Sequence, residues 1–183
     1  MFQAITSQLF NVGFLDAGPR RPTRNIDTVM LHRIGPTLGP APAGSAVEIA
    51  AWFREHPEVL GTTMMPYTFV IPPDGKTEQA VWVSMRTPHG RSWNTRAIGV
   101  ALVGDFRRQP PTDQQVDAAA ALVIRLQDAL RHPLAVYGHT MWHPLPHQTT
   151  TTPGKDCPGK HFEAAYREIL AQVKACGQVH LGI

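Results

Sequence analysis

The stretch AIGVALVGDF, residues 97–106, decides the predicted fold because it is a nearly unbroken apolar run. A strand that is apolar on both faces is typical of a sheet covered by helices on each side, since each face of such a strand packs against helices. We therefore predict that residues 97–106 form the central strand of the sheet.

Four further segments have the β-branched and apolar content of strands. They are DTVMLHRI (27–34), YTFVI (67–71), QAVWVSM (79–85) and LAVYGH (134–139). Asp74 and Gly75 form a strong turn signal between the second and third of these segments, which predicts a β-hairpin. The first and the last carry His32 and His139 near their carboxyl ends.

Helices are predicted between the strands. Two of them begin at capping-box pairs, Ser45 with Glu48 and Thr112 with Gln115. The predicted helices run to about His56 and to about Arg131, and a third runs from near Gly159 to about Ala175. This mixture of elements predicts the α/β class, with a mixed central β-sheet flanked by helices.

Length and composition predict one domain over residues 1–183, because a chain of 20.1 kDa is short for two independent cores. Hydrophobic residues make up 43% and charged residues 17%, which argues against disorder. The formal charge of +3 comes from scattered Lys and Arg residues, so it does not predict a nucleic-acid partner. Cys157 and Cys176 are expected to be reduced thiols.

The N-terminal sequence has no basic region ahead of an apolar run, and no apolar stretch approaches the ~20 residues of a membrane helix. We therefore expect synthesis in the cytoplasm without a signal peptide and no membrane span. Work outside the cytoplasm then requires another route, such as release or delivery.

Three residues can bind zinc if folding gathers them: His32, His139 and Cys157. Two imidazoles and a thiolate leave the fourth tetrahedral position open for water, as a catalytic zinc requires. Their spacing matches no local ligand motif. The residues alone therefore leave open a second interpretation, in which the histidines end strands and the thiol is a small buried group.

The segments around these residues occur in a characteristic order: VMLHR (29–33), PYTFVIPPDG (66–75), HGRSWNTRAIGVALVGDF (89–106), PTDQQ (111–115), VYGH (136–139) and GKDCPG (154–159). Together they resemble the zinc-dependent amidase family that includes bacteriophage T7 lysozyme and the peptidoglycan recognition proteins. The resemblance covers roughly residues 27–170 and leaves extensions at both ends.

The resemblance implies a zinc ion held by His32, His139 and Cys157. It also implies that the Tyr67 hydroxyl hydrogen-bonds the attacking water or the reacting carbonyl, and that Lys155 stabilises the oxyanion. Without the resemblance, Tyr67 reads as a half-buried strand residue and Lys155 as a solvated loop residue.

His89 and Asn94 match positions that the family often uses to bind substrate. The alternative interpretation is structural, because Asn and Gly favour the turn expected before the central strand.

The activity implied is hydrolysis of the amide bond between the lactyl group of N-acetylmuramic acid and L-alanine in peptidoglycan, with intact wall or muropeptides as substrate. A cytoplasmic branch that recycles anhydro-muropeptides is expected to have Asp where Cys157 stands and Glu where Ala101 stands, so this chain departs from it twice. A non-catalytic peptidoglycan-binding module is the other alternative, although loss of the cysteine usually accompanies it. A phage endolysin, a delivered toxin and a cytoplasmic enzyme all remain open, and we favour lysis or delivery.

Overall fold

The computed structural model describes residues 3–4, 18–35, 44–59, 61–139 and 157–176. Its strands form one six-stranded sheet in the order β1-β4-β3-β5-β2-β6. The strands are β1 (Gln3–Ala4), β2 (Thr28–Ile34), β3 (Phe69–Ile71), β4 (Glu78–Gln79), β5 (Ala97–Val103) and β6 (Ala135–Gly138). The pair β3–β4 is antiparallel and the other pairs are parallel, so the sheet is mixed as predicted.

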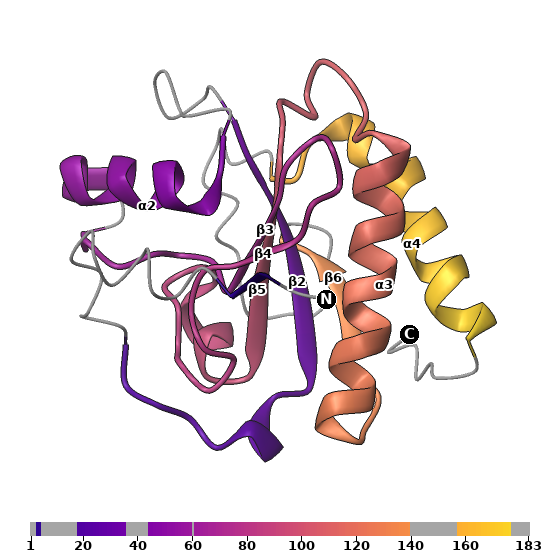
Figure 1. Cartoon of the computed structure of the whole chain (residues 1–183), viewed down its shortest axis with the longest axis horizontal. Coiled ribbons are helices and arrows are strands. Elements are labelled where there is room, and N and C mark those ends of the chain that lie inside the picture. The colour runs from indigo at the N-terminus through magenta and orange to yellow at the C-terminus, as the bar shows by residue number, and fades with distance from the viewer. Residues whose placement is uncertain (1–2, 5–17, 36–43, 60, 140–156, 177–183) are drawn as a thin grey trace.

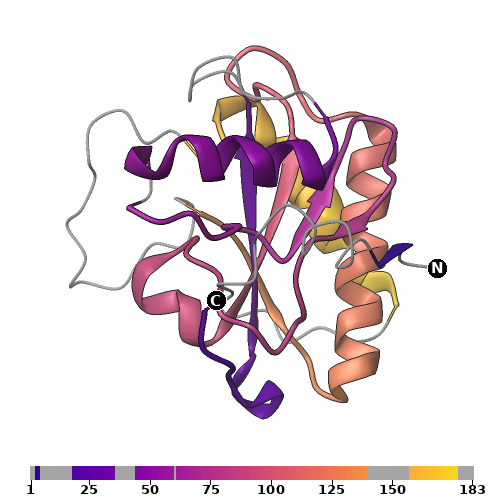
Figure 2. The same cartoon turned by 60° about the vertical axis from the view of Figure 1, so that its left-hand side comes forward.

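Helices cover both faces of this sheet. Helix α2 (Ala46–Glu55) lies on one face, and α3 (Asp113–Leu130) and α4 (Glu163–Ala175) lie together on the other (Figures 1 and 2). Short 3-10 turns connect these elements: η1 (Thr23–Asn25), η2 (Pro57–Val59), η3 (Arg91–Thr95) and η4 (Lys160–Phe162). The α/β class predicted from the sequence is confirmed.

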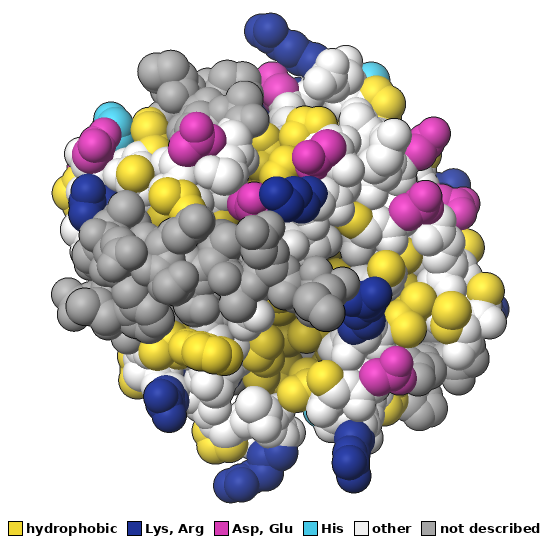
Figure 3. All heavy atoms as spheres, in the orientation of Figure 1, with side chains coloured by type: hydrophobic (Ala, Val, Ile, Leu, Met, Phe, Trp, Pro, Cys, Tyr) yellow, Lys and Arg dark blue, Asp and Glu magenta, His cyan; other side chains and the backbone are white. Residues whose placement is uncertain are grey.

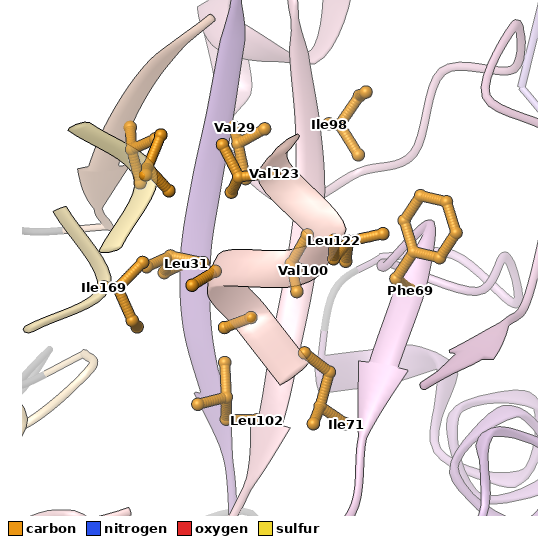
Figure 4. Packing of buried hydrophobic residues seen from close by; sticks show 14 of the residues in the cluster. Val29, Leu31, Phe69, Ile71, Ile98, Val100, Leu102, Leu122, Val123 and Ile169 are labelled. Atoms are coloured by element: carbon orange, nitrogen blue, oxygen red, sulfur yellow. The ribbon is translucent and has the colours of Figure 1, made fainter. Parts of the chain in front are cut away.

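Strand β5 is the centre of the sheet, since it pairs in parallel with β2 on one side and with β3 on the other. Every residue of the strand is buried. Side chains such as Val100 and Leu102 pack under α3 and α4 (Figure 4), whereas Ala101 and Val103 belong to the cluster under α2. The unbroken apolar run therefore reflects burial on both faces.

Both predicted capping boxes are present. The Ser45 hydroxyl accepts from the amide of Glu48, and the Thr112 hydroxyl accepts from the amide of Gln115. The glutamate and glutamine side chains accept in return from the capping residues' amides. These reciprocal bonds satisfy amides that would otherwise lack partners at a helix start, which is why α2 and α3 begin where the sequence predicts.

The predicted strand at 79–85 is wrong in extent. Antiparallel pairing with β3 is present but ends with β4 at Gln79. The chain then leaves the sheet in a turn, where the Met85 amide donates to the Trp82 carbonyl and Trp82 is 50% exposed. The Arg21 amide donates to the Ser84 carbonyl, and Arg20 forms an antiparallel bridge with Met85, so this part of the chain pairs with the N-terminal segment.

The face of the molecule in Figure 3 carries dispersed charge, in agreement with the sequence. On the face shown in Figure 3, Lys and Arg side chains stand apart from one another among acidic and neutral groups. In the part of the chain that the structure describes, no helix has the length and apolarity to cross a membrane. Cys157 and Cys176 are not joined in a disulfide, as expected.

Gln115 offers a test of how α3 is attached to the sheet. Its side chain is fully buried and donates to the Ile71 carbonyl at 2.9 Å and the Val103 carbonyl at 3.0 Å. Gln115→Ala leaves both strand carbonyls without this partner, so we expect a loss of about 2–3 kcal/mol of unfolding free energy in urea titrations. The exposed neighbour is the control, and Gln114→Ala should cost less than about 0.5 kcal/mol. Equal losses would contradict the role given to Gln115.

Candidate metal centre

Parallel pairing brings the two predicted histidine ligands together. Strands β2 and β6 align Leu31 with Gly138, and the His139 amide donates to the Leu31 carbonyl at 2.9 Å. His32 therefore lies beside His139 at the carboxyl ends of adjacent strands, with 4.5 Å between their ring centroids. Residues far apart in the sequence meet because parallel strands end at the same edge of a sheet.

Cys157 completes the cluster from the segment before η4. Its Sγ lies 3.8 Å from His32 Nδ1 and 3.5 Å from the backbone nitrogen of Arg33. One ligand atom from each of His32, His139 and Cys157 lies within 4.8 Å of the others. Zinc–nitrogen and zinc–sulfur bonds of ordinary length place N and S about 3.6 Å apart in a tetrahedral site, so this donor set fits a zinc ion.

The ligand environment favours the protonation states that zinc needs. His32 is only 2% exposed, and burial, reinforced by the neighbouring His139 and His89, holds its pKa well below the usual value. A neutral imidazole keeps a lone pair for a metal. The amide of Arg33 points at the Cys157 sulfur, a contact that stabilises a thiolate.

Tyr67 lies on the same side of the sheet as this cluster. Its ring centroid is 5.2 Å from that of His32, and the residue belongs to the core under α2. Burial raises the pKa of the Tyr67 hydroxyl well above its ordinary value, and the nearby Cys157 adds to the effect. The hydroxyl therefore stays protonated and can donate a hydrogen bond.

His89 and Asn94 occupy the turn before β5 and hold local structure. His89 is 7% exposed, with Nδ1 3.1 Å from His32 Nε2 and Nε2 3.2 Å from the Ala97 carbonyl oxygen. Burial lowers its pKa to about 3.

Asn94 Oδ1 accepts from the amides of His89 and Gly90 at 3.1 and 2.7 Å. Their predicted contact with substrate stays a prediction, and Lys155 lies outside the described residues.

A carboxylate that sequence reasoning missed lies next to the ligand strands. Asp105 follows β5 and accepts from Arg33 Nη1 at 2.8 Å and from Arg107 at 2.7 and 2.9 Å. These bonds, those from Arg107 most of all, lower the pKa of Asp105 to about 2. Arg33 is the residue after His32, so the pair fixes the end of β2 against the end of β5. The sequence shows only an Asp close to two arginines, a pattern that does not distinguish these ion pairs from a solvated loop.

The fold and the site together define an α/β domain with a His–His–Cys cluster that could hold a metal ion at the carboxyl ends of its parallel strands. The model of the N-acetylmuramoyl-L-alanine amidase family matches residues 22–160. This chain belongs to that family.

Curated relatives match part of the chain. Peptidoglycan-recognition protein 1 of Holotrichia diomphalia is 33% identical over 105 residues, which cover 56% of this chain and 52% of that protein. A peptidoglycan-recognition protein of Drosophila melanogaster is 32% identical over 98 residues, which cover 52% of this chain and 48% of that protein. The match therefore spans about half the length of these relatives.

Solved structures share the fold. Amidase LysC from Clostridium intestinale superposes with a TM-score of 0.63 at 21% identity, covering 86% of this chain and 91% of that one. Bumblebee PGRP-SA gives a TM-score of 0.68 at 20% identity, covering 91% and 95%. Peptidoglycan recognition protein LE in complex with tracheal cytotoxin, a monomeric diaminopimelic acid-type peptidoglycan, gives 0.65 at 16% identity, covering 86% and 85%.

The Asp105 ion pairs predict a pH-dependent contribution to stability. Because the folded pKa of about 2 lies below the unfolded value, the contribution is complete above about pH 4 and is lost as the pH falls toward 2. Asp105→Asn should therefore be less stable than wild type at pH 7, and the two unfolding free energies should converge between about pH 4 and 2. The exposed Glu58→Gln is the control. A difference that does not change over this range would refute the ion-pair origin.

The two cysteines offer a matched test of the metal centre. Wild type should bind one zinc ion per chain, measured by elemental analysis and by chelator competition. Cys157→Ala removes the thiolate ligand and should lose tight zinc binding, because thiolate contacts supply much of the affinity. Cys176→Ala, which changes an exposed thiol, should bind zinc like wild type. Unchanged zinc affinity in Cys157→Ala would exclude the cluster as the site.

Proposed function

We propose that this protein is a zinc-dependent amidase that cleaves the bond between the lactyl group of N-acetylmuramic acid and L-alanine in peptidoglycan. One observation carries the proposal: within a chain of the amidase family, His32, His139 and Cys157 offer ligand atoms within 4.8 Å of one another. A donor set of two imidazoles and one thiolate leaves a coordination position open for catalysis.

The protein groups have separate roles in this reaction. Zinc, when bound, supplies an activated water at neutral pH and polarises the amide carbonyl. His32 and His139 would bind it as neutral imidazoles, and Cys157 would bind it as a thiolate that accepts a hydrogen bond from the Arg33 amide. Two neutral ligands and one anionic ligand cancel only part of a divalent charge, so the ligand set preserves a positive charge for the developing oxyanion.

Tyr67 is the proposed second stabiliser of that oxyanion. Its hydroxyl stays protonated because of burial, and its ring lies beside His32, on the side of the sheet that carries the cluster. A fixed donor contributes most where charge develops only in the transition state, since it requires no reorganisation during the reaction. Lys155, two residues before Cys157, is proposed as a cationic partner on the basis of the family pattern.

The substrate class follows from the relatives. Their printed names describe recognition of peptidoglycan, and one neighbour is bound to a monomeric peptidoglycan fragment. An endolysin amidase from Clostridium intestinale is among the structural neighbours, with a TM-score of 0.64. These relationships support a cell-wall polymer or its muropeptides as the substrate. Action on the wall after release or delivery is part of the same proposal.

A peptidoglycan-binding module without catalysis is the second candidate, because the curated relatives are named as recognition proteins. Cys157 argues against it, since its thiolate completes a ligand set suited to a catalytic metal. Binding alone requires only contacts with the polymer. The two candidates therefore differ in whether a product forms.

Product analysis separates the two candidates. Zinc-loaded wild type incubated with defined muropeptides should release free stem peptide, detected by mass spectrometry, and His32→Ala should release none. Tyr67→Phe removes one transition-state hydrogen bond and should lower kcat roughly 10²–10³-fold with little change in KM. Tyr166→Phe, which removes from α4 a hydroxyl that donates to the Val136 carbonyl, is the matched control and should keep kcat.

Two outcomes would contradict the proposal. Folded, zinc-loaded wild type that retains muropeptides without cleaving them would identify a binding module. Cleavage of a different bond, seen as a different product mass, would retain a hydrolase but reject the amidase assignment.

A further inference from the structure

His89 forms a chain of hydrogen-bonding contacts behind the metal cluster. His32 Nε2 lies 3.1 Å from His89 Nδ1, and His89 Nε2 lies 3.2 Å from the Ala97 carbonyl oxygen. His32 turns its other nitrogen, Nδ1, toward Cys157 Sγ at 3.8 Å. The three groups therefore run in series from a backbone carbonyl to the nitrogen that faces the metal position.

The carbonyl determines where the protons lie in this chain. A carbonyl oxygen only accepts, so His89 Nε2 must carry the hydrogen that points at Ala97. In a neutral ring, His89 Nδ1 is then an acceptor, and the hydrogen between the two rings must come from His32 Nε2. His32 is consequently left with its lone pair on Nδ1, the atom that faces Cys157.

The neutral state of His89 follows from its surroundings. Arg21 Nη1 donates to the same Ala97 oxygen at 2.6 Å, and the guanidinium is buried with His89. A second proton on His89 would place two positive charges next to each other away from water, which is costly. Arg21 also fixes the acceptor in position through further bonds to the carbonyls of Asn94 and Val83.

The packing around His89 holds its ring in one orientation. A Cβ built on Gly99 would lie 2.8 Å from His89 Cγ, so the glycine leaves the space that the ring fills on β5. Ala101 pairs with His32, and Gly99 lies two residues before Ala101 on β5, so both positions face the same side of the sheet. The His89 ring, which packs over Gly99, therefore lies on the same face as His32. Asn94 Oδ1 accepts from the amide of His89 and so holds its backbone.

We propose that His89 is a positioning residue that fixes His32 in the Nε2–H tautomer and so presents Nδ1 to the metal. This assignment rests on the zinc site of the proposed function, but it concerns the ligand's proton rather than the reaction. Partners behind metal-binding histidines commonly set tautomer and ring orientation, and their loss typically weakens metal affinity 10–100-fold.

The tautomer can be observed directly. Nitrogen-15 NMR of the His32 ring in the metal-free and the zinc-loaded full chain should show hydrogen on Nε2 in both states, with zinc attached through Nδ1. His32→Gln assigns the signal. Hydrogen on His32 Nδ1, or zinc bound through Nε2, would overturn the proposal whatever the behaviour of the variants.

Three variants test the role of His89, with zinc affinity measured by chelator competition and folding checked by circular dichroism. His89→Leu removes the acceptor and should weaken zinc binding 10–100-fold while His32 loses its single tautomer. His89→Asn keeps an acceptor near the Nδ1 position and should recover most of the affinity. Gly99→Ala should weaken zinc binding by displacing an unchanged His89 ring. His132→Leu, in the turn after α3, is the matched control.

The outcomes separate this proposal from the proposed function. Wild-type zinc affinity and an unchanged His32 tautomer in folded His89→Leu would overturn the positioning role. If His89→Leu does not fold, the zinc affinities of His89→Asn and Gly99→Ala and the His32 tautomer in wild type test the positioning role instead. If the predicted tautomer and affinities are found but no stem peptide is released, the amidase reaction fails and the positioning role stands.

Discussion

The parallel pairing of β2 with both β5 and β6 is the constraint on which the metal cluster depends. It fixes the register that sets His32 opposite Ala101 and brings His139 up to the Leu31 carbonyl. His32 and His139 are far apart in the sequence, so only this pairing brings them together. The apolar core under α3 and α4 maintains this pairing, because it buries one face of all three strands. The position of these candidate ligands at the strand ends thus depends on how the opposite face packs.

Successive side chains along a strand point to opposite faces of the sheet, so the core residues under α3 and the candidate ligand His32 lie on different faces. Val29 and Leu31 face the core under α3, whereas His32 lies on the other face, together with Tyr67 and the core under α2. The Arg33–Asp105 pair ties β2 to β5 just beyond the ligand. Preorganisation of this kind matters for a metal site, because a ligand held in place loses little entropy on binding.

Local signals in the sequence predicted much of the fold. The run at 97–106 and the two capping boxes depend on residues close to one another in the chain. The structure confirms both boxes and the central strand, but the strand ends at Val103 rather than at Phe106. The second strand of the hairpin was predicted to be too long. The apolar pattern of 79–85 does not show that the backbone of this segment pairs with the N-terminal segment. The α3 cap was predictable, whereas the link from Gln115 to two strands was not, since it joins distant positions.

The site was predicted through family resemblance rather than spacing, and the structure explains why. His32, His139 and Cys157 are neighbours only after β2 has paired with β6 and the segment before η4 has packed against them. The contacts of His89 with His32 and with the Ala97 carbonyl could not be predicted from the sequence for the same reason. The family resemblance implied a substrate contact for His89, and the residues alone indicated a turn. Nothing local indicated that Gly99 leaves room for the His89 ring or that Arg21 and His89 bond the same Ala97 carbonyl.

X-ray absorption spectroscopy at the zinc edge of the loaded protein tests the central claim most directly, because it reports the atoms bound to the metal. We expect one sulfur at about 2.3 Å and two imidazole nitrogens at about 2.0–2.1 Å, with a light atom in the fourth position. A zinc ion without sulfur, or without imidazole nitrogens, would contradict the cluster of His32, His139 and Cys157 as the metal centre.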